Sequence, residues 1–247
     1  MNFPVDFRKE QERIHGKFLV PNAIEIWGWG TPADKERANR RAELLIERAC
    51  ILSGMAVLEF GCGTGMFSRY FVEKGIKLTA IDLSLDLIQE AQKNLHVNIS
   101  FQVGDIESLV FPQESFDAVV GSSVLHHVNV EKALREAFRV LKSGSYIAFA
   151  EPNMMNPQIA LQKNIPYIKR KMGDSPDETA FFRWPMVRLL EQIGFSEIDV
   201  NPYDFLHPAI PLKFIPLAKK LSYILETTPL VREIAGSIFL SARKPAK

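Results

Sequence analysis

The sequence predicts a doubly wound α/β fold, in which helices cover both faces of one largely parallel sheet. Three observations predict it. Short apolar runs of strand length recur through the middle of the chain, stretches with helical periodicity separate them, and a glycine-rich loop follows the first run. Because parallel strands need long right-handed crossovers, this alternation is typical of a sheet that is buried on both faces.

The predicted core of this sheet extends from residue 52 to residue 151. Between its strands, Leu85, Ile88 and Ala91 share one face of a helix, and a second apolar helical face lies within 133–141. The apolar runs that we expect to form the strands are residues 55–60, 77–82, 98–103, 116–121 and 146–151.

Further elements flank this core. Upstream, Thr31 is expected to cap a helix that has Pro32 at its first position and Asp34 in its first turn. Downstream, a helix over 186–193 should end at Gly194, ahead of two more strands. These last strands are predicted at 197–203 and 237–243, and the chain divides into an N-terminal lid and helix (1–50) and a main domain (51–247) with a lid (152–183) and a helical insertion (205–235).

The bulk composition indicates one domain with appendages and excludes several protein classes. A chain of 247 residues is long for one core and short for two. Thirty Lys plus Arg against 29 Asp plus Glu give a net charge of +1, which supplies no general field for binding nucleic acid. Charges near the start argue against a signal peptide, and no apolar run is long enough to span a membrane. Cys50 and Cys62 fit neither a disulfide framework nor a metal site, so we expect a cytoplasmic protein with reduced thiols.

The strongest motif is the loop Gly61-Cys62-Gly63-Thr64-Gly65, between a predicted strand and a helix. Glycines there let the backbone turn sharply and let a ligand approach main-chain N–H groups at a helix N-terminus. The dinucleotide fingerprint GxGxxG would need a glycine at position 66, where this chain has Met66. The loop therefore favours a nucleotide-like ligand other than a nicotinamide or flavin dinucleotide.

Three acids lie at the ends of three successive predicted strands. Glu59 would repel a pyrophosphate but attract an ammonium group, which favours a nucleoside that carries an amino acid. Asp82 lies where a ribose diol binds in doubly wound nucleotide sites, and Asp105 can accept a hydrogen bond from the amine of adenine. Taken singly, Glu59 could be a partnered strand-end residue, Asp82 a cap ahead of Ser84 and Asp105 a turn former. Their joint occurrence favours ligand binding.

Residues 55–151 resemble the class I S-adenosylmethionine-dependent methyltransferases, in particular their small-molecule branch. The stretches that carry the resemblance are VLEFGCGTG, AIDLS, GDIESL, FDAVVGSSVLHHV and RVLKSGSYIAFAE. It implies a Rossmann-like sheet of seven strands with the last strand antiparallel, and S-adenosyl-L-methionine as cofactor. The implied cofactor contacts are Glu59, Gly61, Cys62, Gly63 and Gly65 at the methionine part, Asp82 and Leu83 at the ribose, Asp105 and Ile106 at the adenine, and Gly121 and Ser122 near the donor methyl.

The chemistry of methyl transfer indicates what else the site needs. Displacement at a sulfonium gains mainly from aligning donor and nucleophile and excluding water, and it requires no metal. A hydroxyl acceptor also needs a base. His126 and His127 follow the fourth predicted strand and Glu151 ends the fifth, so all three should meet at the ligand-binding edge of the sheet. Each also has a structural interpretation: a histidine could pack the next helix, and Glu151 could anchor the lid.

Candidates for holding the acceptor lie outside the core. We expect the pocket to be roofed by the segment around Trp27 and Trp29, by the stretch after Pro152 and by the insertion. An anionic acceptor could be held by arginines, although a solvated helix face is the simpler interpretation for the first three of them: Arg37, Arg40, Arg41 and Arg183.

The insertion carries an apolar helical stripe flanked by lysines, formed by Phe214, Leu217, Leu221 and Ile224. This stripe could shelter an apolar or lipid-linked acceptor, rest on a membrane surface, or pack against the core.

The leading hypothesis from the sequence is methylation of a small molecule, on oxygen in preference to nitrogen or carbon. Acceptor-facing lids diverge freely, so the sequence does not identify the acceptor. One alternative is an NAD-dependent oxidoreductase, which Met66 and Glu59 disfavour. Another is an inactive, cofactor-binding partner subunit, against which the complete set of acids argues.

Overall fold

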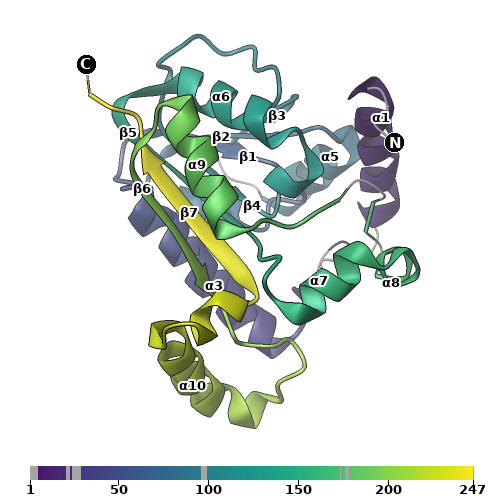
Figure 1. Ribbon diagram of the computed structural model, residues 1–247. Coiled ribbons are helices and arrows are strands. Elements are labelled where there is room, and N and C mark those ends of the chain that lie inside the picture. Colours follow the sequence, from purple (N-terminus) through teal and green to yellow (C-terminus); the bar gives the residue numbers. More distant parts are fainter. Residues whose placement is uncertain are drawn as a thin grey trace.

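A seven-stranded sheet forms the centre of the protein (Figure 1). The computed structural model, which describes residues 5–20, 23, 29–95, 99–172, 174–175 and 178–246, gives the strand order β3-β2-β1-β4-β5-β7-β6. The first five strands run parallel, whereas β7 lies antiparallel between β5 and β6. The predicted fold class and its antiparallel last strand are therefore confirmed. The strands are β1 (Ala56–Phe60), β2 (Lys77–Asp82), β3 (Ser100–Val103), β4 (Phe116–Ser122), β5 (Leu141–Pro152), β6 (Ser196–Tyr203) and β7 (Ser237–Arg243).

Helices occupy the connections between the strands and both ends of the chain. The α-helices are α1 (Val5–Leu19), α3 (Pro32–Arg48), α4 (Ser68–Val72), α5 (Leu85–Asn94), α6 (Val130–Val140), α7 (Pro157–Asn164), α8 (Pro166–Lys171), α9 (Arg183–Ile193) and α10 (Ile215–Thr227). Short 3-10 helices are η2 (Leu125–His127), η3 (Leu212–Phe214) and η4 (Val231–Ile234).

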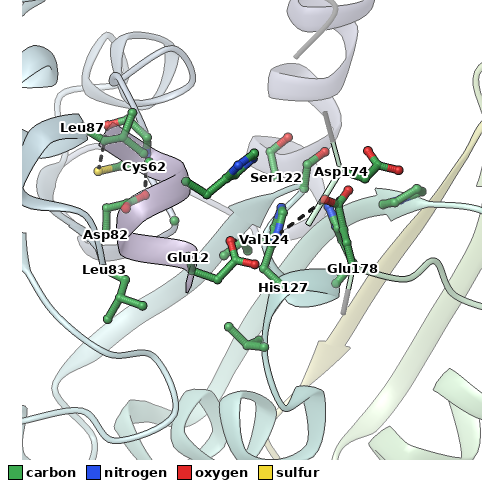
Figure 2. A pocket seen from close by; sticks show the side chains of 18 of the residues that line it. Glu12, Cys62, Asp82, Leu83, Leu87, Ser122, Val124, His127, Asp174 and Glu178 are labelled. Carbon is green, nitrogen blue, oxygen red and sulfur yellow. Dashed lines mark hydrogen bonds and ion pairs between the residues drawn. The ribbon is translucent and has the colours of Figure 1, made fainter. Parts of the chain in front are cut away.

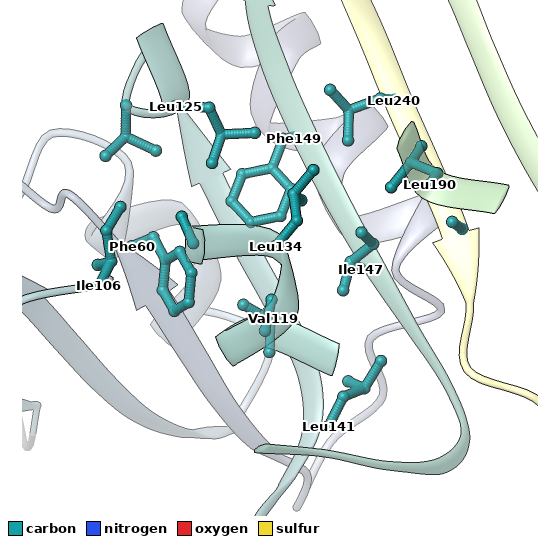
Figure 3. Close-up of a cluster of buried hydrophobic side chains, with 14 of the residues drawn as sticks. Phe60, Ile106, Val119, Leu125, Leu134, Leu141, Ile147, Phe149, Leu190 and Leu240 are labelled. Atoms are coloured by element: carbon teal, nitrogen blue, oxygen red, sulfur yellow. The ribbon is translucent and has the colours of Figure 1, made fainter. Parts of the chain in front are cut away.

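One face of the sheet packs against α6 and α9. Leu58, Val119 and Phe149 point to this side, where they form an apolar cluster with Leu134 of α6 and Leu190 of α9 (Figure 3). All five side chains are fully buried. Because successive strand residues point to opposite faces, their neighbours must be covered from the other side.

That second face packs against α3, α4 and α5. Val57, Val120 and Ala148 lie in a cluster with Leu45 of α3 and Phe71 of α4, and all are fully buried. With helices on both faces, the carboxyl ends of the parallel strands are left as the edge at which polar groups can gather.

The predicted helix ends flanking the core are confirmed. Thr31 caps α3: its Oγ1 accepts from the amide of Asp34 at 3.2 Å, and the Asp34 carboxylate accepts from the amide of Thr31 at 3.0 Å. α9 ends at Gly194, whose φ of 108° is in the left-handed region that glycine adopts without strain.

Some boundaries differ from the sequence-based expectation. β5 begins at Leu141 and not at residue 146, because Leu141 pairs with Phe116 ahead of a shift in register. α9 begins three residues earlier than expected, at Arg183. Residues 27 and 28 of the predicted aromatic cover lie outside the described residues, whereas Trp29 lies within them.

The appendages leave the sheet at its carboxyl edge. α7 and α8 follow β5, and α10 lies between β6 and β7, where it projects beyond the helices that cover the sheet (Figure 1). α1 contacts α5 from the far end of the chain. Among the described residues, no helix is long and apolar enough to cross a membrane.

Candidate functional site

A cavity of about 450 Å³ lies at the carboxyl ends of β1, β2 and β4. Its walls combine the glycine loop with residues of α1, α7 and the segments that follow β3 and β4. Figure 2 shows Cys62, Asp82 and Leu83 at one end, and His127 and Glu178 at the other. The cavity is therefore long enough to bring residues from both halves of the expected site together.

The glycine loop has no room for side chains. Gly61 has a φ of 62°, and a Cβ on it would lie 2.3 Å from Cγ2 of Val124. Gly65 has a φ of 80°, and its Cβ would lie 2.8 Å from Cδ1 of Leu95. Gly61, Cys62 and Gly63 line the cavity, so the loop offers it close backbone approach.

Asp82 connects the glycine loop to α5. Its Oδ2 accepts from the amide of Gly63 and its Oδ1 from the amide of Ser84, each at 2.9 Å. Burial raises the pKa of Asp82, and these two amides lower it only in part. Since each carboxylate oxygen has a second lone pair, Asp82 can hold the loop and still accept a ligand hydroxyl. Leu83 lines the cavity beside it.

Glu59 lies under the loop and is not among the residues that line the cavity. Its Oε2 accepts a 2.5 Å hydrogen bond from Ser68 at the start of α4. Burial raises the pKa of Glu59 to about 8, against the lowering effect of this hydrogen bond. Its influence on a ligand would therefore act through the loop, as a field from below, in place of the direct contact that we expected.

The segment after β3 meets α1 across the cavity. Asp105 accepts from the amide of Glu107 at 2.9 Å, the turn-forming contact, and its Oδ2 lies 2.5 Å from Nζ of Lys9. Glu107 is paired with Arg8. Ile106 lines the cavity and is buried. Both acids thus bind the helix that covers them, an arrangement that the sequence alone did not predict.

α1 also closes over the start of α5. A Cβ on Gly16 of α1 would lie 2.5 Å from Oγ of Ser84, so the two backbones approach closely. Arg8, Lys9 and Glu12 of α1 line the cavity. The charges of α1 gave no sequence signal for this role, because similar patterns occur on solvated helices.

The end of β4 is joined to α3 through Arg41. Arg41 donates to the hydroxyls of Ser122 (3.1 Å), Ser123 (2.9 Å) and Ser237 (2.8 Å), and its guanidinium stacks 4.9 Å from the ring centroid of Trp29. The side chain is buried, lines the cavity, and has no carboxylate within ion-pairing distance among the described residues. Its expected position on a solvated helix face is therefore wrong.

The other candidate arginines already have acidic partners. Arg37 binds Asp34 and Asp204, Arg40 binds Glu226, and Arg183 binds Glu233. A buried guanidinium surrounded only by hydroxyls is costly unless an anion joins it, so Arg41 is the candidate for an anionic ligand group. Gly121, one residue before Ser122, packs under Phe149 and does not line the cavity.

Glu151 is fully buried, and both its oxygens are engaged. Oε1 accepts from the amides of Val124 (3.0 Å) and Leu125 (2.9 Å), and Oε2 lies 2.7 Å from Nδ1 of His126. The Nε2 of His126 lies 3.5 Å from Glu178. Burial lowers the pKa of His126, but Glu151 and Glu178 outweigh it and raise the pKa to about 9. His126 is therefore an imidazolium near neutral pH.

His127 points into the cavity between two further carboxylates (Figure 2). Its Nδ1 lies 3.3 Å from Glu12 of α1 and 4.0 Å from Glu178. Burial raises the pKa of Glu12, but the contact with His127 lowers it by more, so Glu12 is a carboxylate. Burial likewise raises the pKa of Glu178, and the nearby histidines and Lys163 outweigh it, leaving the pKa well below its ordinary value.

The grouping of His126, His127 and Glu178 also has the composition of a metal site, with ligand atoms within 4.8 Å of one another. Lys163 of α7 already pairs with Glu178 and lies 3.0 Å from Asp174. Its ammonium thus supplies the positive charge that the carboxylates require. Glu178 and Lys163 were missed at the level of sequence, because only folding brings them beside the histidines.

The roof of the cavity differs from the one expected. Trp29, Pro152 and Ile159 line it, as does Pro208 at the base of the insertion. The stripe of Phe214, Leu217, Leu221 and Ile224 does not line it, and each of these side chains is about half exposed. The insertion's stripe therefore cannot shelter an acceptor inside this cavity, and the expectation of an apolar pocket built from it is wrong.

Comparison with known proteins identifies the fold family. Residues 58–149, from β1 to β5, match the model of a methyltransferase domain. The chain belongs to the class I S-adenosylmethionine-dependent methyltransferases. Its cofactor is S-adenosylmethionine, and it is an enzyme of the methyltransferase class.

Individual relatives share different lengths of this methyltransferase. The demethylmenaquinone methyltransferase of Renibacterium salmoninarum is 26% identical over 182 residues, which cover 66% of this chain and 76% of that protein. The malonyl-acyl-carrier protein O-methyltransferase of Pectobacterium atrosepticum is 36% identical over 99 residues, covering 40% and 39%. Among solved structures, the 4+2 cyclase SpnF superimposes with a TM-score of 0.70 at 21% identity, over 97% of both chains, which shows a shared fold.

The cavity of this methyltransferase fits its cofactor. The glycine loop leaves backbone exposed where a Cβ would collide, Asp82 has lone pairs free for hydroxyls, and Arg41 is a buried cation without a carboxylate partner among the described residues. These are complementary to a nucleoside that carries a zwitterionic amino acid.

Proposed function

We propose that this methyltransferase transfers the methyl group of S-adenosylmethionine to a hydroxyl of a small-molecule acceptor, with His127 as the general base. The observation that carries the proposal is the position of His127, held between Glu12 and Glu178 in the same cavity as the glycine loop. Bound cofactor supplies a sulfonium methyl group that is open to in-line displacement.

In this proposal the cofactor is held along the carboxyl edge of the sheet. Gly61, Cys62, Gly63 and Gly65 give backbone contacts to the methionine part, Asp82 and Leu83 hold the ribose, Asp105 and Ile106 hold the adenine, and Gly121 and Ser122 flank the methyl group. Glu59 favours the ammonium group from beneath the loop, and Arg41 binds the carboxylate of the methionine part. Opposite charges on the two sides of the loop suit a zwitterion.

His127 suits the role of base better than its neighbours do. A base must be unprotonated at the working pH and reach the acceptor. His126 has a pKa raised to about 9, and Glu151 is buried with its oxygens occupied, so both act by positioning. Glu12 can fix the His127 tautomer by accepting from Nδ1, which leaves Nε2 to remove the hydroxyl proton as the methyl group is transferred.

The polar end of the cavity bears on the class of acceptor. Gln162, Lys163 and Asp174 line it together with the histidines. Such a lining suits an acceptor whose reacting end carries hydroxyl or other polar groups. The two curated relatives compared above are named for different acceptors, a quinone and a protein-bound acid, so neither supplies this one.

A methyl-transfer assay with mixed hydroxylated acceptors would test the proposal. Release of S-adenosylhomocysteine should depend on an acceptor, and mass spectrometry should find the new methyl group on oxygen. His127→Asn should lower kcat by roughly a hundredfold or more while leaving cofactor affinity unchanged. His207→Asn, an exposed histidine outside the cavity, is the matched control. Full activity of His127→Asn, or a methyl group on nitrogen or carbon, would contradict the proposal.

A further inference from the structure

The insertion presents an apolar surface that the fold leaves uncovered. We define it as the α10 patch: Leu212, Phe214, Leu217, Leu221, Ile224 and Leu230, each exposed by 49% to 85%. The first five lie on η3 and α10, and Leu230 follows with a φ of 67°, which a leucine rarely adopts. An aliphatic side chain that is 85% exposed on a strained backbone gains nothing from the core.

The buried side of the same helix is firmly attached to the protein. Ile215 packs with Leu206 and with Ala33 at the start of α3. Ser222 of α10 donates to Glu226, which is also bound by Arg40 of α3. Because this inner face is already satisfied, the α10 patch is a second, outward apolar face on one helix, and rotation of α10 cannot bury it.

The charges around the α10 patch are sorted by sign. The two glutamates within residues 205–235, all of which the structure describes, turn inward: Glu226 to Arg40, and Glu233 to Arg183. The exposed Lys213 and Lys220 flank the patch, and the Nζ of Lys213 lies 4.9 Å from the centroid of the Phe214 ring. Apolar side chains bordered by cations, with the acids withdrawn, match the interface of an anionic lipid bilayer.

We propose that the α10 patch docks this methyltransferase on an anionic membrane surface. The leucines and Phe214 enter the boundary between headgroups and acyl chains, and Lys213 and Lys220 contact the lipid phosphates. A second copy of this chain fits less well, because a two-fold interface over this patch would bring the same lysines of both copies together. The patch begins four residues after Pro208, which lines the cavity, so docking holds one rim of the cavity at the bilayer.

Vesicle flotation with the full chain tests this docking. The protein should float with vesicles of phosphatidylcholine mixed with phosphatidylglycerol, bind phosphatidylcholine alone weakly, and detach as salt rises. The double variants Leu217→Gln/Leu221→Gln and Lys213→Glu/Lys220→Glu should each lower vesicle affinity by roughly tenfold or more. The matched controls are Val110→Gln, an exposed apolar residue ahead of β4, and Lys77→Glu, an exposed lysine at the start of β2.

The outcomes separate docking from methyl transfer and from misfolding. All variants should keep the wild-type melting temperature and bind S-adenosylhomocysteine in solution without vesicles, because the altered residues do not line the cavity. Loss of vesicle binding with both of these retained supports the proposal. Absence of binding by the wild type, equal binding by the double variants, or a concentration-dependent dimer that Leu217→Gln/Leu221→Gln disrupts would overturn it. Methyl transfer to oxygen is tested separately, since none of these measurements involves an acceptor.

Discussion

Glu151 holds His126 in place: its Oε2 lies 2.7 Å from the Nδ1 of the imidazole, and its other oxygen accepts the amides of Val124 and Leu125. One buried carboxylate thus fixes the turn after β4 and the charge state of the first histidine. The second histidine is left to face the cavity. Two adjacent residues of the same type thereby acquire different protonation behaviour.

Replacement of Glu151 by Gln should destabilise the protein by about 3 to 5 kcal/mol at pH 7, as expected when one partner of a buried ion pair is removed. Because the folded pKa of His126, about 9, lies above its ordinary value, the stabilisation is complete below pH 6.5 and is lost as pH rises through 9. Denaturant unfolding at pH 7 and pH 10 should therefore show a smaller penalty at the higher pH. Glu131→Gln, at an exposed position on α6, is the control. An equal penalty at both pH values would mean that His126 carries no charge in this pair.

The fold could be predicted because it depends on local patterns. Apolar runs, helical periodicity, the Thr31 cap and Gly194 each act within a few residues, and together they fixed the strand sequence and the antiparallel end. The boundaries that were missed, such as Leu141, depend on pairing with a strand elsewhere in the chain. Long-range pairing leaves no periodic signal in the residues concerned.

The site could be predicted only where its residues follow strands. Asp82 and His127 lie at the carboxyl edge because the strand ends direct them there. Glu12 and Glu178 come from a lid helix and a loop that the sequence leaves free to be placed anywhere. Arg41 resembled a solvated residue, since nothing in a helix pattern shows that three serines of distant strands and loops surround it.

Gly61→Ala should unfold the cofactor loop locally and abolish cofactor binding. The new Cβ would meet Val124 at 2.3 Å on a backbone with positive φ, so we expect a loss of roughly 2 to 5 kcal/mol of stability from strain and overlap together. Gly54→Ala is a matched control, because Gly54 also has a positive φ, 86°, but nothing lies within 4 Å of its Cβ. It should lose only the backbone part, roughly 1 to 2 kcal/mol.

A second variant separates overlap from backbone strain. Shortening Val124 to Ala in the Gly61→Ala background should restore part of the stability, measured by denaturant unfolding, and part of the affinity for S-adenosylhomocysteine, measured by calorimetry. If the double variant is no better than Gly61→Ala, contact with Val124 is not the reason that position 61 requires glycine.

Asp82→Asn should weaken S-adenosylhomocysteine binding by roughly 1 to 3 kcal/mol, because a side-chain amide offers one acceptor oxygen where the carboxylate offers two. One of the amides of Gly63 and Ser84 loses its partner in the variant, so the loop is held less firmly. Titration calorimetry measures the effect, with Asp86→Asn in the first turn of α5 as the control. Wild-type affinity in a folded Asp82→Asn variant would show that Asp82 only caps α5.

Glu59→Gln should stabilise the protein without ligand at high pH, although it removes a charge from the cofactor site. Burial raises the pKa of Glu59 from 4.5 to about 8, so the wild type gains from the protonated carboxyl at low pH and loses that stability as pH rises through 8. The variant has no such dependence and should gain roughly 1.4 kcal/mol per pH unit on the wild type between pH 5 and pH 8. Denaturant unfolding across this range measures the difference, and Glu73→Gln, at an exposed position near the end of α4, should show none. Saturating S-adenosylhomocysteine should reduce the advantage of the variant, because an ammonium group above the loop favours the ionised Glu59. If the advantage does not change with pH, Glu59 is already ionised in the free protein; if ligand does not reduce it, the field of Glu59 does not reach the methionine part of the cofactor.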